Sequence, residues 1–121
     1  AIKYFDRALE IQVRMKDRFM EAKVLNNLAG SHSQMGDTDK ALSLLKKSIL
    51  IAEDLEEIEF LALPNATMGN IYLGKFDYSS AIDFYKKAIA MFISQGSEYF
   101  AYRAEINVIR CLIQLGNYNH K

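Results

Sequence analysis

The sequence repeats itself with a period of 40 residues. Each period carries a small residue, a larger one four positions on and another small one three positions later: Ala1, Phe5 and Ala8; Ala41, Leu45 and Ser48; Ala81, Tyr85 and Ala88. A fixed period of roughly 20 to 50 residues is typical of stacked supersecondary units. The chain is therefore predicted to be an array in which each unit packs on its sequence neighbours.

Helical spacing of apolar residues fills both halves of each period. Apolar side chains recur three and four residues apart, as on one face of an α-helix, and no segment alternates as a strand does. The pattern predicts an all-α fold of about six helices, at about residues 1–15, 19–35 and 39–54, around Met68, and at about residues 79–94 and 98–115. Short loops join the helices, so neighbours in sequence should form antiparallel pairs.

Glycine and charged residues mark several predicted breaks between these helices. Gly36 should end one helix in the left-handed conformation, which glycine enters without steric cost. A charged stretch at residues 16–18 is expected to separate the first two predicted helices. A second break is expected near Glu56, between the helix at 39–54 and the one around Met68, because acidic side chains are unfavourable at a helix C-terminus.

Three further positions concern the later helices. Phe76 stands where a turn glycine is expected, and Gly74 should take over that turn. Gly116 should end the last helix. Pro64 requires that its helix either begins near Leu63 or bends, because proline inside a helix removes a hydrogen bond.

One repeat domain is predicted to cover residues 1–121. Its parts are the second helix of a partial repeat at 1–16, complete repeats at 19–55 and 58–95, and the first helix and turn of a partial repeat at 98–121. Neither end carries the polar outer face that terminal repeats need for solubility, so the chain is interpreted as a fragment of a larger protein.

Charge and composition narrow the classes of function. Fifteen basic and fifteen acidic residues leave no net charge, which argues against nucleic-acid binding, because displacing counterions from phosphates needs a basic stripe. No apolar run approaches the ~20 residues that span a membrane, so no membrane contact is predicted. The single cysteine, Cys111, forms no internal disulfide, and a cytoplasmic location is expected.

The repeat resembles the tetratricopeptide repeat family, in its variant with longer units. The resemblance spans the whole chain and is closest at Met68-Gly69, Tyr72, Asp77-Tyr78, Ala81, Tyr85 and Ala88. It implies a right-handed superhelix of stacked antiparallel helix pairs, with the first helix of each unit lining a concave groove. It also implies that this groove binds a peptide or helix of a partner protein.

Polar residues on the first helices, outside the packing stripe, are the candidate contacts in this groove. They are Lys23, Asn26, Asn27 and Gln34 in the first complete unit, Asn70 in the second, and Arg103, Asn107, Arg110 and Gln114 in the last. The resemblance implies that such asparagines hydrogen-bond a partner's main chain, since an amide both donates and accepts. The cations favour an acidic peptide. The simpler alternative is that these residues form only the solvated side of amphipathic helices.

Other reactive side chains have structural explanations. His32 occupies an inward position and is expected to be a packed, hydrogen-bonded core residue, not a metal ligand or a pH switch. Cys111 is expected to be a small apolar filler. The carboxylates from Glu53 to Glu59 lack the alternating ligands of a calcium loop. No cofactor, metal or catalytic site is predicted, and the chain is not expected to be an enzyme.

The leading interpretation is a non-catalytic module that binds another protein in its concave groove. Two alternatives stay open. Apolar end faces of the repeat stack would bind another copy of the chain and make it an oligomerisation element. Alternatively, the repeats would form the sensory or regulatory region of a larger bacterial signalling protein.

Overall fold

A computed structural model describes the chain from residue 2 to residue 119, and the surroundings of its side chains at residues 7, 10 and 11 and from 13 to 116. That part consists of α1 (Ile2–Gln34), α2 (Thr38–Asp54), η1 (Ile58–Leu61), α3 (Ala62–Gly74), α4 (Tyr78–Ser94) and α5 (Glu98–Asn119). Here η1 is a short 3-10 helix and the others are α-helices. No strand occurs within residues 2–119, and the predicted all-α class is confirmed.

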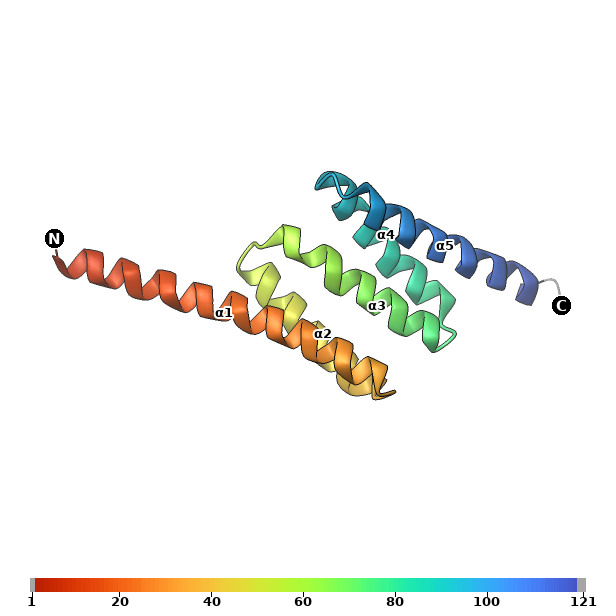
Figure 1. The fold of residues 1–121 in the computed structure, drawn as a ribbon, viewed down its shortest axis with the longest axis horizontal. Coiled ribbons are helices and arrows are strands. Elements are labelled where there is room, and N and C mark those ends of the chain that lie inside the picture. Colours follow the sequence, from red (N-terminus) through yellow and green to blue (C-terminus); the bar gives the residue numbers. More distant parts are fainter. Residues whose placement is uncertain (1, 120–121) are drawn as a thin grey trace.

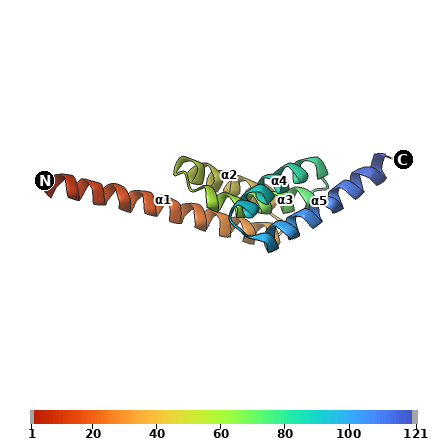
Figure 2. The same cartoon turned by 90° about the horizontal axis from the view of Figure 1, so that it is seen from above.

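The helices lie in two layers (Figure 1 and, seen from above, Figure 2). The first layer contains α1, α3 and α5, and the second contains α2 and α4. α2 packs on the C-terminal half of α1, while α4 packs against both α3 and α5. The N-terminal half of α1 projects from the stack (Figure 1). The arrangement is the expected solenoid of antiparallel helix pairs.

The turns between the helices share one backbone conformation. Gly36, Glu56, Phe76 and Gly96 have φ angles of 84°, 58°, 64° and 74°, so a left-handed residue ends a helix every 20 residues. Glycine adopts this conformation freely, whereas a side chain there costs roughly 1–2 kcal/mol. The break expected near Glu56 is confirmed. The expectation for Gly74 is wrong, because it is the last residue of α3 and Phe76 itself makes the turn.

The predicted break at residues 16–18 is absent, and α1 runs through it as one helix of 33 residues. Lysine and arginine are good helix formers, and no glycine or proline interrupts this stretch. Arg18 also bonds to Asp54 of α2, with 2.9 Å between Nη1 and Oδ2, and this pair ties α1 to the end of α2. The predicted packing positions Ala1, Phe5 and Ala8 lie outside the residues whose side chains are described.

The predicted helix end at Gly116 is also absent, because α5 continues to Asn119. Gly116 does not adopt the left-handed conformation that ends the earlier helices. The part of the chain that the structure describes therefore contains five α-helices and not six. Pro64 lies in the first turn of α3, where the backbone N–H groups have no helical partner, so the late start that was one of the two expectations is confirmed.

Small residues allow each hairpin to close. In the first hairpin, Ala29 and Leu45 belong to one fully buried cluster. In the second hairpin, the equivalent positions are Gly69 and Tyr85, and a Cβ added at Gly69 would lie only 2.8 Å from the Tyr85 ring. The two hairpins therefore use the same backbone register with different pairs of side chains.

Two leucines of the outermost first-layer helices, α1 and α5, lie on uncovered sides of the stack. Leu28 is 46% exposed and Leu112 is 54% exposed. Met68, which is equivalent to Leu28, is only 1% exposed because the preceding hairpin covers it. The sides of α1 and α5 that no described helix covers are called the end faces, and they carry Leu28 and Leu112 respectively.

Candidate peptide-binding groove

A hollow of about 210 Å³ lies on the first layer between α3 and α5, and is called the α3–α5 hollow. Its lining is Leu63, Ala66, Thr67 and Asn70 from α3, Phe100, Arg103, Ala104 and Asn107 from α5, and Tyr85 and Phe92 from α4. The hollow thus joins apolar and polar groups from two units of the repeat.

Three of the predicted groove residues meet in this hollow. Asn70 comes from α3, and Arg103 and Asn107 come from α5. Arg110, one turn further along α5, lies close enough to Tyr85 for its charge to act on the hydroxyl. Gln114 is exposed near the C-terminal end of the same helix and does not line the hollow.

The other predicted residues lie on α1, away from the hollow. Lys23, Asn27 and Gln34 are exposed. The Lys23 ammonium stands 4.4 Å from the centre of the Phe19 ring, a favourable cation–π distance. Asn26 is half-buried, and its Oδ1 has no hydrogen-bond partner in the described part of the chain. The structure therefore divides the predicted set between two regions of the first layer.

Tyr85 ties three helices together beneath the hollow. It is 1% exposed, and its hydroxyl donates a hydrogen bond to Oδ1 of Asn70. Burial raises the pKa of Tyr85 to about 12, with a smaller rise from Cys111, while the neighbouring Asn107 side chain and the charge of Arg110 lower it. The hydroxyl therefore remains a donor at neutral pH. Because Asn70 already uses its oxygen in this bond, its amide N–H groups are what it offers a ligand.

Positive charge and apolar surface lie side by side at the rim. The Arg103 guanidinium is 5.8 Å from the centre of the Tyr99 ring, which supports its long side chain. None of the ion pairs among the described residues uses Arg103 or Arg110. Leu63 and Phe100 are 48% and 46% exposed. This combination suits a segment that carries a carboxylate next to an apolar side chain.

The predicted set of contacts left out part of this lining because it was selected for polarity. Leu63 and Thr67 lie 40 residues after Lys23 and Asn27, so the register of the repeat places them on the same surface. Phe100 has no such signal, because its exposure depends on how α5 is placed against α4. Tyr85 follows the core pattern of the repeat, and only its contact with Asn70 shows that it also shapes the surface.

His32 and Cys111, the two side chains considered for chemistry, are both at least partly buried. His32 is packed, with its Nδ1 3.4 Å from Oδ2 of Asp37, but Nδ1 makes no hydrogen bond in the described part of the chain, so the expected bonded state is wrong there. Cys111 is fully buried, and burial raises the pKa of its thiol, which suits an apolar filler. Within the described residues, no group of three or more acidic, histidine or cysteine side chains is placed to hold a metal.

Comparison with known families agrees with the two-layered architecture. A family model described as tetratricopeptide repeat matches residues 1–54 and, in a second match, residues 20–94. The chain belongs to the tetratricopeptide repeat family. Repeats of this family mediate protein–protein interactions, so a partner protein is the general class of ligand. None of the helices in the described part is both long and apolar enough to cross a membrane.

Proposed function

We propose that this tetratricopeptide repeat domain binds an acidic segment of a partner protein on its first layer, centred on the α3–α5 hollow. The main support is the convergence of Asn70, Arg103 and Asn107 on one hollow with apolar walls. Hollows that combine apolar walls with a few polar groups are typical binding sites. The resemblance implies that the first helices line the concave face of the solenoid, and concave faces of solenoids are common binding surfaces.

Each residue has a distinct role in this proposal. The N–H groups of Asn70 donate to a main-chain carbonyl of the segment, and the Asn107 amide, held beside Tyr85, completes the main-chain contacts. Arg103 and Arg110 bind carboxylates, and Leu63 and Phe100 cover an apolar side chain. Lys23, Asn27 and Gln34 extend the same face along α1. The role is non-catalytic, and we place the protein in the cytoplasm.

The test begins with an array of acidic peptides and continues with calorimetry on the tightest binder. Arg103→Glu is expected to weaken binding roughly tenfold or more, because hydrogen bonds between charged groups contribute about 1.5–3 kcal/mol. Lys86→Glu is the matched control, since it makes the same charge change at an exposed position of α4. Equal losses in the two variants would show that only net charge matters and would contradict the proposed site.

A second candidate function is self-association through the end faces. Val24 and Leu28 on α1 are 50% and 46% exposed, and Ile109 and Leu112 on α5 are 55% and 54% exposed. Patches of exposed apolar residues often mark interfaces. Light scattering over a concentration series would detect such assembly, and Leu112→Glu should abolish it. A mass that stays monomeric at all concentrations would remove this candidate.

A further inference from the structure

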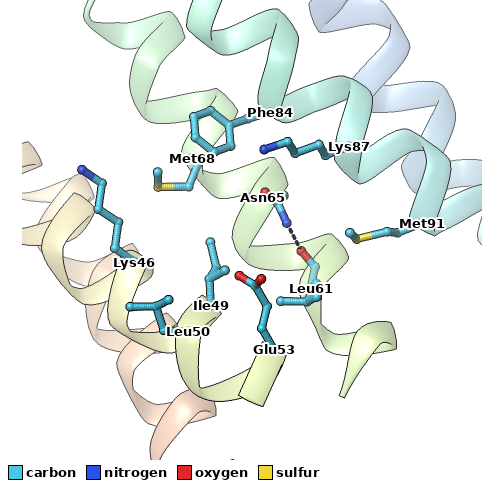
Figure 3. Close-up of a pocket in the computed structure, with 10 residues that line it drawn as sticks. All are labelled: Lys46, Ile49, Leu50, Glu53, Leu61, Asn65, Met68, Phe84, Lys87 and Met91. Atoms are coloured by element: carbon cyan, nitrogen blue, oxygen red, sulfur yellow. Dashed lines mark hydrogen bonds between the residues drawn. The ribbon is translucent and has the colours of Figure 1, made fainter. Parts of the chain in front are cut away.

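The second layer carries a larger depression that the proposed groove does not use. α2 and α4 stand apart as two walls above α3 and leave an open space of about 550 Å³, the α2–α4 valley (Figure 3). Ile49 and Leu50 line it from α2, Phe84 and Met91 line it from α4, and Leu61 and Met68 form its floor. Its surface is mostly apolar.

The valley continues into a second hollow. That hollow, of about 390 Å³, lies along α4 and η1 and shares Lys87 and Met91 with the valley. Leu50 in the valley is 67% exposed and Ile58 in the adjoining hollow is 64% exposed. Large apolar side chains left open beside a depression are typical of a docking surface. The two depressions together form a trough that follows the direction of α4.

Charges in this trough are separated by sign. Lys46 and Lys87 stand on opposite walls toward one end, while the carboxylate of Glu53 lies toward the other end (Figure 3). Glu59 lines the adjoining hollow. It belongs to η1, directly after the turn that follows Glu53 at the end of α2. No ion pair among the described residues involves these four side chains. The α2–α4 valley thus has its ammonium groups toward one end and the Glu53 carboxylate toward the other, with apolar side chains between them, and Lys87 also borders the adjoining hollow.

We propose that the α2–α4 valley binds an amphipathic helix of a partner protein, lying antiparallel to α2 and α4. Its N-terminal end would lie near Glu53 and its C-terminal end near Lys46 and Lys87. In this direction the positive end of the helix dipole meets the carboxylate and the negative end meets the ammonium groups. Apolar side chains spaced along one face of the helix fill the valley, as in other helix-in-groove complexes.

The partner's own charges follow from the same arrangement. Basic residues in its first turn pair with Glu53 and Glu59, and acidic residues in its last turn pair with Lys46 and Lys87. Basic residues at the N-terminus and acidic residues at the C-terminus interact unfavourably with the dipole of a free helix. The isolated segment is therefore weakly helical and gains helix on binding. The side chains on the second layer thereby select both the composition and the direction of the partner.

A pair of synthetic peptides tests this proposal with the full chain. Each has about 16 residues, or some 24 Å of helix, with leucines at helical spacing on one face. The forward peptide carries lysines near its N-terminus and glutamates near its C-terminus, and the reversed peptide has the same residues with the charges exchanged. Fluorescence anisotropy should show the forward peptide binding at least about tenfold more tightly, and circular dichroism should show it gaining helix.

Variants on exposed positions identify the surface involved. Lys46→Glu combined with Lys87→Glu should abolish the preference between the peptides, because both ends of the trough are then acidic, and Leu50→Glu should weaken the forward peptide about tenfold or more. Arg103→Glu, on the first layer, should leave both affinities unchanged, so failure of the groove proposed above would not affect this result.

Three outcomes would overturn the proposal. They are equal affinity or no affinity for the two peptides, a loss of binding in Arg103→Glu, and a wild-type dimer that Leu50→Glu converts to a monomer. The second outcome places the peptide on the first layer, and the third makes another copy of the chain the occupant of the valley.

Discussion

The two complete hairpins follow one register but fill their centres differently. In the first, Ala29 on α1 accompanies Leu45 on α2; in the second, Gly69 on α3 lies against Tyr85 on α4. A methyl group missing from the first-layer helix makes room for a larger ring on the second-layer helix. Close packing at the centre of a hairpin therefore constrains the combined volume of the two side chains, and not the size of either one alone.

The two hairpins also differ in where their buried hydrogen bond lies. In the first hairpin, the buried Ser48 hydroxyl donates to the Ala22 carbonyl at 2.6 Å. The equivalent position in the second hairpin is Ala88, and there the Tyr85 hydroxyl bonds to Asn70 instead. Leu45 has no group that can do this. The polar floor of the α3–α5 hollow is therefore a product of the second hairpin's packing.

The largest expected effect comes from converting one hairpin's pair into the other's. Gly69→Ala should destabilise the fold by about 3 kcal/mol, because the new Cβ would meet a fully buried ring at 2.8 Å. Adding Tyr85→Leu recreates the pair of the first hairpin and should recover much of this loss. Urea denaturation of the single and double variants measures both effects. A double variant less stable than Gly69→Ala alone would show that the pairs are not interchangeable.

A smaller effect should distinguish Tyr85 from its counterpart Leu45, which has no ionisable group, at alkaline pH. The pKa of Tyr85 is raised from 10.0 to about 12, so the unfolded chain ionises at this residue before the folded chain does. Its contribution to stability is therefore fully present below pH 10 and is lost as the pH rises toward 12, by about 2 kcal/mol.

Tyr85→Phe provides the reference for this measurement, because every other ionisable group is retained. Urea midpoints of the two proteins, measured at intervals from pH 9 to pH 12, should converge as the wild type loses its contribution. Curves that stay parallel over this range would show that the folded hydroxyl ionises no less readily than the unfolded one.

The smallest expected effects lie in the turns, where equivalent positions hold glycine in one hairpin and phenylalanine in the other. Phe76→Gly should stabilise the fold by about 0.5–1 kcal/mol by relieving a left-handed side chain, reduced by the lost contact with the Tyr78 ring. Gly36→Ala should destabilise it by about 1 kcal/mol. Thermal unfolding of both variants gives the comparison, and a destabilised Phe76→Gly would mean that the ring contact outweighs the backbone strain.

The turns also show how far sequence alone specifies this fold. Gly36 by itself predicts a left-handed turn, because few other residues adopt a positive φ at a low cost in energy. Phe76 gives no such signal, and only the regular spacing of the turns requires it to behave like glycine. The helix break predicted at the charged residues 16–18 was wrong, because these residues are compatible with a helix and the chain does not turn back at that point.

The binding surfaces divide in a similar way. Register and polarity were enough to bring Asn70, Arg103 and Asn107 to one candidate surface. They could not show that the oxygen of Asn70 is already bonded to Tyr85, because that contact depends on the packing of three helices. The α2–α4 valley was not predicted. It depends on the distance between α2 and α4, and the sequence of neither helix determines that distance.

α3 is common to both surfaces. Met68 forms part of the valley floor on one side of this helix, and Asn70 forms part of the hollow on the other. A ligand that tilts α3 from either side necessarily reshapes the opposite one. Thermodynamic reciprocity then requires that two such ligands strengthen or weaken each other by the same factor, although they bind on opposite sides of one helix.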